Sequence, residues 1–441
     1  MIPNRNYPSR WRDYQSQFKR TQRLKRLKKR LPVLFLVLCA VCAGIFFLFH
    51  EGAKRHSPAV SIHPPHQDPR EPNPPRLSRQ NLANMMDQAM QNGSVTGKQF
   101  VFENDGQRYR FTTTVQTKLQ NYTERLLRHS RTLQAAVVVL DPSDGRILAM
   151  ASRDTNGGSD NICLKADFPA ASLFKIVSAA AALEAAGFTP DKPLYFRGGR
   201  HTLYKSQLKQ SRGRYSTRTS FRKAFAISNN SVFGKIGIYD LGQETIAVYA
   251  NRFLFNRDIP FDLPLDVSFI SVPEDEYGLA EIASGFNKRT RMSPMHAALI
   301  SSAVANQGNM TAPWLVSAVL DESDRILYRG RPMLLYSPIG QKASDQLKLL
   351  MQDTVRYGTS RTAFGQLRRY KVFKGFELGA KTGTINDPKD RYKYDWLTAF
   401  AIPPKDENAI SISVLSVHGP LLGTRATELA RAIIHYYYST Y

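Results

Sequence analysis

One uncharged apolar run, LPVLFLVLCAVCAGIFFLF at residues 31–49, constrains this chain more than any other feature. A helix of that length crosses the hydrocarbon core of a bilayer. A buried core helix fits less well, because such helices are rarely apolar on every face. A cleaved signal peptide would have a shorter apolar region, and no clear small-residue cleavage site follows Phe49. The run therefore predicts one transmembrane helix.

The charges beside this run orient the predicted helix. Residues 1–30 carry eleven Lys or Arg against the single acid Asp13. Because basic flanks stay on the cytoplasmic side, we expect residues 1–30 to be a basic cytoplasmic tail. Everything after about residue 50 then lies outside the cytoplasmic membrane, in a periplasmic or similar extracytoplasmic space. The tail accounts for +10 of the net charge of +25, so about +15 remains for the outer part, which suits anionic lipid or wall polymers, or a plain solvated surface, rather than nucleic acid.

The next two stretches predict a linker and a small structured segment. Residues 50–80 are rich in proline and poor in large apolar side chains, which is typical of an extended, solvated linker. Residues 81–130 are expected to form a small juxtamembrane segment. Its pattern indicates a short helix, a hairpin that turns at Asp105-Gly106, and a second helix with leucines at helical spacing.

Residues 131–441 predict one large α+β domain. Apolar, β-branched runs indicate a hairpin at 135–152 and late strands at 396–402 and 409–417. Strands at both ends of a helical middle predict an antiparallel sheet that the two ends share, with helices flanking it. Helices are expected at 172–187, around 220–255, 277–306 and 342–357, and at 428–438.

The cysteines and histidines indicate no metal or disulfide chemistry. Only Cys163 lies beyond the apolar run, so no disulfide can form within the outer part of the chain. The three Cys and nine His show neither C-x-x-C nor H-E-x-x-H spacing. We therefore expect no metal site and no cofactor.

Three short patterns carry the candidate chemistry, and the first needs its context to be interpreted. They are Ser172-Leu-Phe-Lys175, Ser228-Asn-Asn230 and Lys381-Thr-Gly383. The S-x-x-K spacing also occurs at 16–19, 206–209 and 220–223. Among these, only Ser172 opens a helix that is otherwise almost wholly apolar.

The Ser172 context favours an activated nucleophile. Positions three apart share one helix face, so Lys175 can reach the Ser172 hydroxyl. A lysine on an apolar helix is desolvated, which lowers its pKa and favours the neutral amine. A neutral lysine can take the proton from an attacking serine. A capping serine beside a lysine that extends to solvent explains this segment alone equally well.

The other two patterns supply polar groups that such a serine needs. Ser228 and Asn230 stand at the head of an apolar segment, where they could relay protons and hold the Lys175 ammonium, or simply cap a helix. The Lys381 pattern precedes a predicted strand. A lysine on a sheet edge followed by two threonine hydroxyls would suit a substrate carboxylate, and a glycine leaves room for the substrate backbone. An exposed turn is the plainer interpretation.

Taken together and in this order, the patterns resemble the penicillin-binding transpeptidases, whose signature is S-x-x-K, S-x-N and K-T-G. The likeness covers roughly residues 110–435 and includes LDPSDGRILAMAS, FPAASLFKIV, ISNNSVFGKIG, ANQGNMTAP, VRYGTS and AKTGT. The resemblance implies a serine penicillin-binding, β-lactamase-like transpeptidase fold. It also implies that Ser172 is acylated by a D-Ala-D-Ala stem peptide or by a β-lactam, with Lys175 as base and Ser228 and Asn230 assisting.

The resemblance further implies how the substrate is held. Lys381, Thr382 and Thr384 would bind the terminal carboxylate, with Gly383 between them. The backbone N–H groups of Ser172 and Thr384 would form the oxyanion hole. Three places depart from the family pattern, and one is residues 50–110, which are much shorter than the non-catalytic segment typical of monofunctional members. Residues 169–171 read Pro-Ala-Ala where many members have Pro-Gly, and the chain reads ASGFNKRTRMSP around residue 285, so we expect a different wall there.

The implied function is a peptidoglycan D,D-transpeptidase that cross-links the cell wall. A D,D-carboxypeptidase, in which water replaces the amine acceptor, is the alternative within enzymes. A non-enzymatic membrane-bound β-lactam sensor or cell-wall scaffold is the alternative from another class. The expected partners are stem peptides, β-lactams, the plasma membrane and proteins of a cell-wall synthesis complex.

Overall fold

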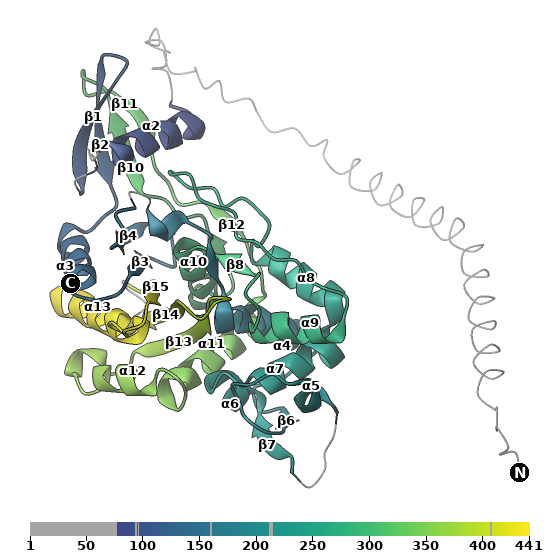
Figure 1. Cartoon of the computed structure of the whole chain (residues 1–441). Coiled ribbons are helices and arrows are strands. Elements are labelled where there is room, and N and C mark those ends of the chain that lie inside the picture. Colours follow the sequence, from purple (N-terminus) through teal and green to yellow (C-terminus); the bar gives the residue numbers. More distant parts are fainter. Residues whose placement is uncertain (1–76, 93–94, 96, 159–160, 211–214, 406–407) are drawn as a thin grey trace, which may run out of the picture. The chain divides into compact units, whose positions relative to one another are not determined.

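A five-stranded antiparallel sheet lies at the centre of the computed structural model, which describes residues 77–92, 95, 97–158, 161–210, 215–405 and 408–441 (Figure 1). The strand order is β13-β14-β15-β3-β4. These strands are β3 (Gln134–Leu140), β4 (Ile147–Asp154), β13 (Glu377–Asn386), β14 (Lys393–Ile402) and β15 (Ile410–His418). Two early strands and three late ones therefore share one sheet, in which β3 pairs with β15, and the predicted α+β class with a shared antiparallel sheet is confirmed.

Helices cover both faces of this sheet, which explains why its strands read as continuous apolar runs. Every residue of β15 is buried. Along β3, Ala136 and Val138 belong to the core on the α10 (Pro294–Ala305) side, and Val137 and Val139 to the core on the opposite side. The opposite side is covered by α3 (Thr117–Arg128), α12 (Arg361–Leu367) and α13 (Ala426–Thr440).

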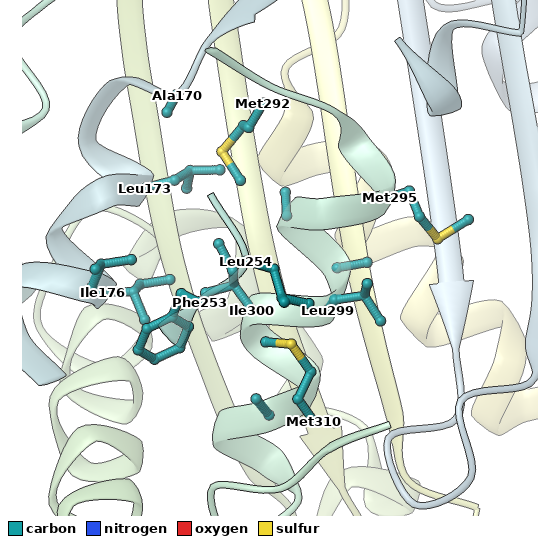
Figure 2. Packing of buried hydrophobic residues seen from close by; sticks show 14 of the residues in the cluster. Ala170, Leu173, Ile176, Phe253, Leu254, Met292, Met295, Leu299, Ile300 and Met310 are labelled. Atoms are coloured by element: carbon teal, nitrogen blue, oxygen red, sulfur yellow. The ribbon is translucent and has the colours of Figure 1, made fainter. Parts of the chain in front are cut away.

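The core on the α10 side anchors the turn and helix that contain the candidate nucleophile (Figure 2). Leu299 and Ile300 of α10 lie close to Leu254 in this core, and all three side chains are buried. Leu173 and Ile176, on either side of the Lys175 turn, belong to the same cluster. Each fully buried side chain of this size contributes about 2 kcal/mol. The segment around residue 172 is therefore fixed by packing on both flanks.

A second sheet joins residues 81–130 to a later part of the chain. Its order is β1-β2-β10-β11, with strands β1 (Gln99–Asn104), β2 (Gln107–Thr113), β10 (Val316–Leu320) and β11 (Ile326–Arg329). The helix α2 (Arg79–Gln91) buries Leu82 and Met86 in the core that includes Phe111 of β2. The predicted short helix, the hairpin turning at Asp105-Gly106 and the second helix are all present.

The other elements surround these sheets. They are η2 (Ile162–Leu164), β5 (Phe168–Pro169), η3 (Ala171–Phe174), α4 (Lys175–Glu184), β6 (Pro193–Phe196), α5 (Lys205–Leu208), β7 (Thr217–Ser220), α6 (Phe221–Ala226), α7 (Asn230–Lys235), η4 (Ile236–Leu241), α8 (Gly242–Arg252), α9 (Glu276–Ser284), β8 (Arg291–Met292), β9 (Met310–Thr311), β12 (Leu334–Tyr336), α11 (Gln341–Arg356) and η5 (Lys371–Phe373).

The predicted helical stretch 277–306 is in fact two helices. Gly285 ends α9 in the left-handed conformation with φ 63°. Ser293 then caps α10 by accepting from the His296 N–H, and Pro294 takes the first helical position. Glycine after a helix and proline at the start of one are the ordinary signals for these two ends. A pattern of apolar spacing alone did not locate the break.

The predicted tail 1–30, the predicted transmembrane helix 31–49 and most of the linker 50–80 lie outside the described residues. The described residues all belong to one compact unit, Pro72–Tyr441. Within them, no helix combines the length and apolar character that crossing a bilayer requires.

Candidate active site

Ser172 lies in a 3-10 turn directly before α4, half-buried at the wall of a cavity. Lys175 is the first residue of α4, and its Nζ lies 2.9 Å from the Ser172 Oγ. The predicted helix from residue 172 therefore begins as η3 and becomes α-helical only at Lys175. The spacing of three residues brings the two side chains together as the sequence indicated.

Three oxygen atoms surround the Lys175 amine. Besides the Ser172 hydroxyl, Nζ lies 2.7 Å from Asn230 Oδ1 and 2.5 Å from the Ser284 carbonyl oxygen. The lysine side chain is fully buried. Two of the three oxygens can only accept, so a neutral amine donates its two N–H bonds to them. Its lone pair is then left for the Ser172 O–H.

Burial and charge both favour that neutral form. Desolvation lowers the pKa of Lys175 well below its ordinary value, and the positive charge of Lys381 lowers it further. Lys381 is also fully buried, and burial lowers the pKa of its ammonium to about 7. Two buried lysines with lowered pKa values, one beside Ser172 and the other beside Ser228, make a site that can move protons near neutral pH.

The second and third patterns meet at Lys381. Its Nζ donates to Ser228 Oγ at 3.0 Å and to the Thr382 carbonyl oxygen at 2.8 Å. Asn230 begins α7 and donates its Nδ2 to the His201 carbonyl oxygen at 2.9 Å, which fixes the orientation of its amide. The structure thus brings Ser172, Lys175, Ser228, Asn230 and Lys381 into one connected group, joined by hydrogen bonds and one cavity.

Two residues of this site have left-handed backbone although neither is glycine. Ala171, directly before the nucleophile candidate, has φ 49°, and Ser228 has φ 55°. Such conformations cost on the order of 1 kcal/mol or more each and recur at functional sites. Gly285, at the predicted altered wall, lies against this turn: a Cβ on it would be 2.0 Å from the Ala171 carbonyl oxygen.

Gly383 lies against the turn that contains Ser172. We expected its missing side chain to make room for a substrate backbone. That expectation stays a prediction, and in the structure a Cβ on Gly383 would lie 3.1 Å from the Ala171 Cβ and 3.3 Å from the Ser172 backbone nitrogen. The glycine lets the edge strand β13 approach the turn that contains Ser172. This approach also brings the neighbouring Thr384 close to that turn.

The two threonines point to the other face of the sheet, because side chains alternate along a strand. Thr382 Oγ1 lies 2.5 Å from Thr359 Oγ1, just after α11. Thr384 Oγ1 donates to Asp395 Oδ1 on β14 at 3.2 Å. Both threonines line the same cavity as Ser172.

Asp395 and Arg425 are site residues that our sequence reasoning missed. Asp395 is buried, and its carboxylate accepts from Arg425 at 3.3 Å and from the Ala426 N–H at 3.1 Å. Burial would raise the pKa of Asp395, but the neighbouring His418 and Arg425 hold it below its usual value. An acid directly before the apolar run WLTAFAI was the available signal, since a charge in a buried strand needs a partner.

One cavity of about 640 Å³ connects these groups. Its lining includes the candidate residues Ser172, Ser228, Asn230, Thr382 and Thr384. It also includes residues that the sequence patterns did not indicate: His201, Gly285, Phe286, Thr359, Thr362, Ala363, Gln366, Ile385, Arg425, Thr427, Glu428 and Arg431. Among the described residues, no group of three or more His, Cys, Asp and Glu could hold a metal ion.

A buried lysine hydrogen-bonded to a serine, a second buried lysine and an edge strand beside them define a serine acyl-transfer site. The sequence profile of the penicillin binding protein transpeptidase domain matches residues 135–435. That match spans more than half of the chain, and the chain belongs to this family.

Named relatives agree with the family match. Stage V sporulation protein D of Bacillus subtilis is 25% identical over 295 residues, covering 63% of this chain and 44% of the relative. The peptidoglycan D,D-transpeptidase MrdA of Haemophilus influenzae is 24% identical over 376 residues, covering 74% of this chain and 55% of the relative. The chain thus spans about half the length of these relatives.

Solved structures show the same fold. The D,D-transpeptidase domain of a peptidoglycan glycosyltransferase from Eggerthella lenta superposes with a TM-score of 0.62 at 20% identity, covering 79% of this chain and 85% of that chain. Penicillin-binding protein A of Mycobacterium tuberculosis in its ceftriaxone acyl-enzyme complex gives a TM-score of 0.61 at 22% identity, covering 74% of this chain and 79% of that chain.

Proposed function

We propose that this protein is a peptidoglycan D,D-transpeptidase that works through an acyl-enzyme on Ser172. The contact that carries the proposal is the 2.9 Å approach of the buried Lys175 Nζ to the Ser172 Oγ. The names of the relatives support the substrate class, since several are called peptidoglycan D,D-transpeptidases. The same names favour a transpeptidase over a D,D-carboxypeptidase.

The first half of the reaction forms the acyl-enzyme. Neutral Lys175 takes the hydroxyl proton as Ser172 Oγ attacks the penultimate D-Ala carbonyl of a stem peptide. Backbone N–H groups of Ser172 and Thr384 hold the developing oxyanion, a role that the close approach of Gly383 to the Ser172 turn supports. The proton then passes to the departing D-Ala nitrogen, with Ser228 as the relay nearest to Lys381.

The substrate carboxylate is held at the face of β13 that carries Thr382 and Thr384. Thr382 and Thr384 present hydroxyls into the cavity, and Lys381 supplies positive charge beside them. Asn230 orients the Lys175 amine through its 2.7 Å contact. A β-lactam would occupy the same groups, because its ring amide and carboxylate stand in for the D-Ala-D-Ala amide and carboxylate.

We also propose the membrane arrangement that the sequence predicts. Residues 1–30 are a cytoplasmic tail, residues 31–49 a single transmembrane helix, and residues 50–80 a linker. Residues 81–130 lie next to the membrane as part of the outer body, and residues 131–441 form the catalytic domain on the extracytoplasmic side. The plasma membrane and proteins of a cell-wall synthesis complex are its proposed partners.

Covalent labelling with a fluorescent penicillin tests the function. The detergent-solubilised full-length chain should be labelled, and Ser172→Ala should abolish the label. Ser220→Ala is the matched control, because Ser220 also starts an S-x-x-K sequence but caps α6 through the Lys223 N–H. No labelling of correctly folded protein would overturn the enzyme and leave the cell-wall scaffold. Hydrolysis of a stem peptide without transfer to any amine would favour the carboxypeptidase.

A further inference from the structure

A second cavity lies between β6 and the helical run formed by α7 and η4. Its volume is about 340 Å³, and no residue that the structure describes lines both this cavity and the active-site cavity. In Figure 1 the β6–β7 hairpin lies below α7, against which β6 packs. A volume of this size lies near the lower end of the range for ligand sites, so it suits a small ligand.

The helical wall of this second cavity is fixed by packing on another of its faces. Gly237 faces α9, where a Cβ on it would lie 2.5 Å from the Ala283 Cβ and 2.8 Å from the Leu279 carbonyl oxygen. Residues 236–241 form a π-helical turn, a rare conformation that recurs at functional sites. The wall is therefore preformed, as the walls of binding cavities usually are.

Apolar side chains form much of the cavity surface. Val232 and Ile236 are one helical turn apart and buried, so they form an apolar floor. Leu194 of β6 and the exposed Tyr239 also line the cavity. The Tyr239 hydroxyl donates to the Leu208 carbonyl oxygen at 3.1 Å, which holds its ring in place. A ligand with an apolar body would cover this surface.

Lys235 supplies a positive charge at the edge of this floor. Its half-buried ammonium donates to the Tyr195 carbonyl oxygen at 3.1 Å. Among the residues that the structure describes, none places a carboxylate within ion-pair distance of it. Burial and the positive charge of Arg197 lower the pKa of Lys235. A partly desolvated cation is stabilised by an anion beside it, so Lys235 favours a negatively charged ligand.

The other charges of the cavity limit the ligand to one negative charge. Lys192 Nζ lies 4.0 Å from Asp240 Oδ1 and 3.4 Å from the centre of the Phe188 ring. Lys192 and Asp240 therefore offset one another, and the charge of Lys235 remains. A single carboxylate matches that charge, whereas Asp240 would repel a dianion.

We propose that this second cavity binds a small molecule in which one carboxylate is joined to a short apolar body. The carboxylate pairs with the Lys235 ammonium. The apolar body lies on Val232 and Ile236, beside the Tyr239 ring. The cavity is separate from the acylation chemistry, so this inference does not depend on the proposed function.

The test compares a carboxylic acid with its neutral amide. The probes are 3-(4-fluorophenyl)propionate and 3-(4-fluorophenyl)propionamide, and fluorine NMR measures their binding to the detergent-solubilised full-length chain. Micelles without protein give the background. The acid should bind with a dissociation constant of about 1 mM, the order that a ligand of this size reaches. The amide should bind about tenfold more weakly, because it loses the charge-assisted hydrogen bond.

Variants assign that preference to the second cavity. Lys235→Met keeps the apolar stem, so it should bind the amide like the parent and lose the tenfold preference for the acid. Lys235→Arg keeps the charge and should retain most of the preference. Leu194→Glu adds a carboxylate to the cavity and should abolish binding of the acid. Lys223→Met is the matched control, because Lys223 is exposed on α6 and does not line the cavity.

Each outcome decides the inference. Equal binding of acid and amide by the parent overturns it, and so does an undiminished preference in Lys235→Met. Inorganic phosphate that displaces the fluorinated acid as well as 3-phenylpropionate does would show that the site does not select a monoanion. If Lys235→Met does not fold, as judged by urea unfolding, unchanged binding of the acid by Leu194→Glu overturns the inference instead. These measurements need no acyl-enzyme, so failure of penicillin labelling would remove the proposed function alone.

Discussion

Replacing Gly285 with alanine should disable the nucleophile without directly altering it. A Cβ at this position would lie 2.0 Å from the Ala171 carbonyl oxygen and 3.0 Å from the Ser172 Cα. Ordinary contacts to a Cβ are longer than about 3 Å, so the Ala171 turn must move by roughly 1 Å. A displacement of that size at a reacting group costs about a hundredfold in rate.

The free-energy penalty of placing alanine in a left-handed conformation must be separated from the effect of this displacement. Another glycine of the chain provides a close control. Gly187, which follows α4, has φ 64° against 63° for Gly285, and a Cβ there meets nothing within 4 Å. Gly187→Ala therefore carries the same left-handed penalty of about 1 kcal/mol. We expect Gly187→Ala to lower the free energy of unfolding by that amount while acylation stays near the parent rate.

The assay is the second-order rate constant for acylation by a fluorescent penicillin, with urea unfolding measured on the same samples. Gly285→Ala should lose about a hundredfold in acylation. It should also lose more stability than the control. If both alanine variants acylate at the same rate, the steric argument is wrong. The close contact with Ala171 would then not control where Ser172 lies.

Three further predictions concern charges. The acylation rate should rise with pH on the acidic limb of its pH profile, as Lys175 becomes neutral. Lys381→Met should move that limb to higher pH, because the Lys381 charge lowers the pKa of Lys175. An acidic limb that stays at the parent pH would contradict this. Burial lowers the pKa of His296 to about 4, so the unfolded chain binds a proton at this residue more readily than the folded chain does. The free energy of unfolding should therefore fall by roughly 3 kcal/mol as the pH drops from about 6.5 to 4. Urea unfolding of the parent compared with His296→Gln measures this loss. Arg222 contacts the buried Asp353 at 2.6 and 3.0 Å. Arg222→Met should therefore lower the free energy of unfolding by about 2 to 4 kcal/mol. A decrease below about 0.5 kcal/mol would show that solvent replaces the ion pair.

The sequence predicted those parts of the site that depend on local spacing. Ser172 and Lys175 are three residues apart on a helical turn, so their contact needed no tertiary information. The apolar runs likewise located the strands of the central sheet. The order of the three patterns then indicated the family, which indicated that Ser228 and Lys381 would join them.

The sequence could not predict contacts that depend on how distant segments approach one another. The space beside Gly383 is filled by the Ala171 turn, which is more than two hundred residues away in the chain. The partnership of Asp395 with Arg425 joins β14 to the residue before α13, and neither residue belongs to a short pattern. The left-handed backbone of Ala171 depends on the packing around it, because alanine itself disfavours that conformation.

The pairing of β3 with β15 means that the central sheet can be completed only late in synthesis. Val138 pairs with Ser413, so the middle of the sheet closes a loop of nearly the whole domain. Such long-range pairing makes folding slow, because the chain loses much entropy before the contacts form. During synthesis the segment containing Ser172 is complete long before Lys381 and its strand exist. If Ser172 is the nucleophile we propose, it therefore has no Lys381 beside its site until β13 has joined the sheet.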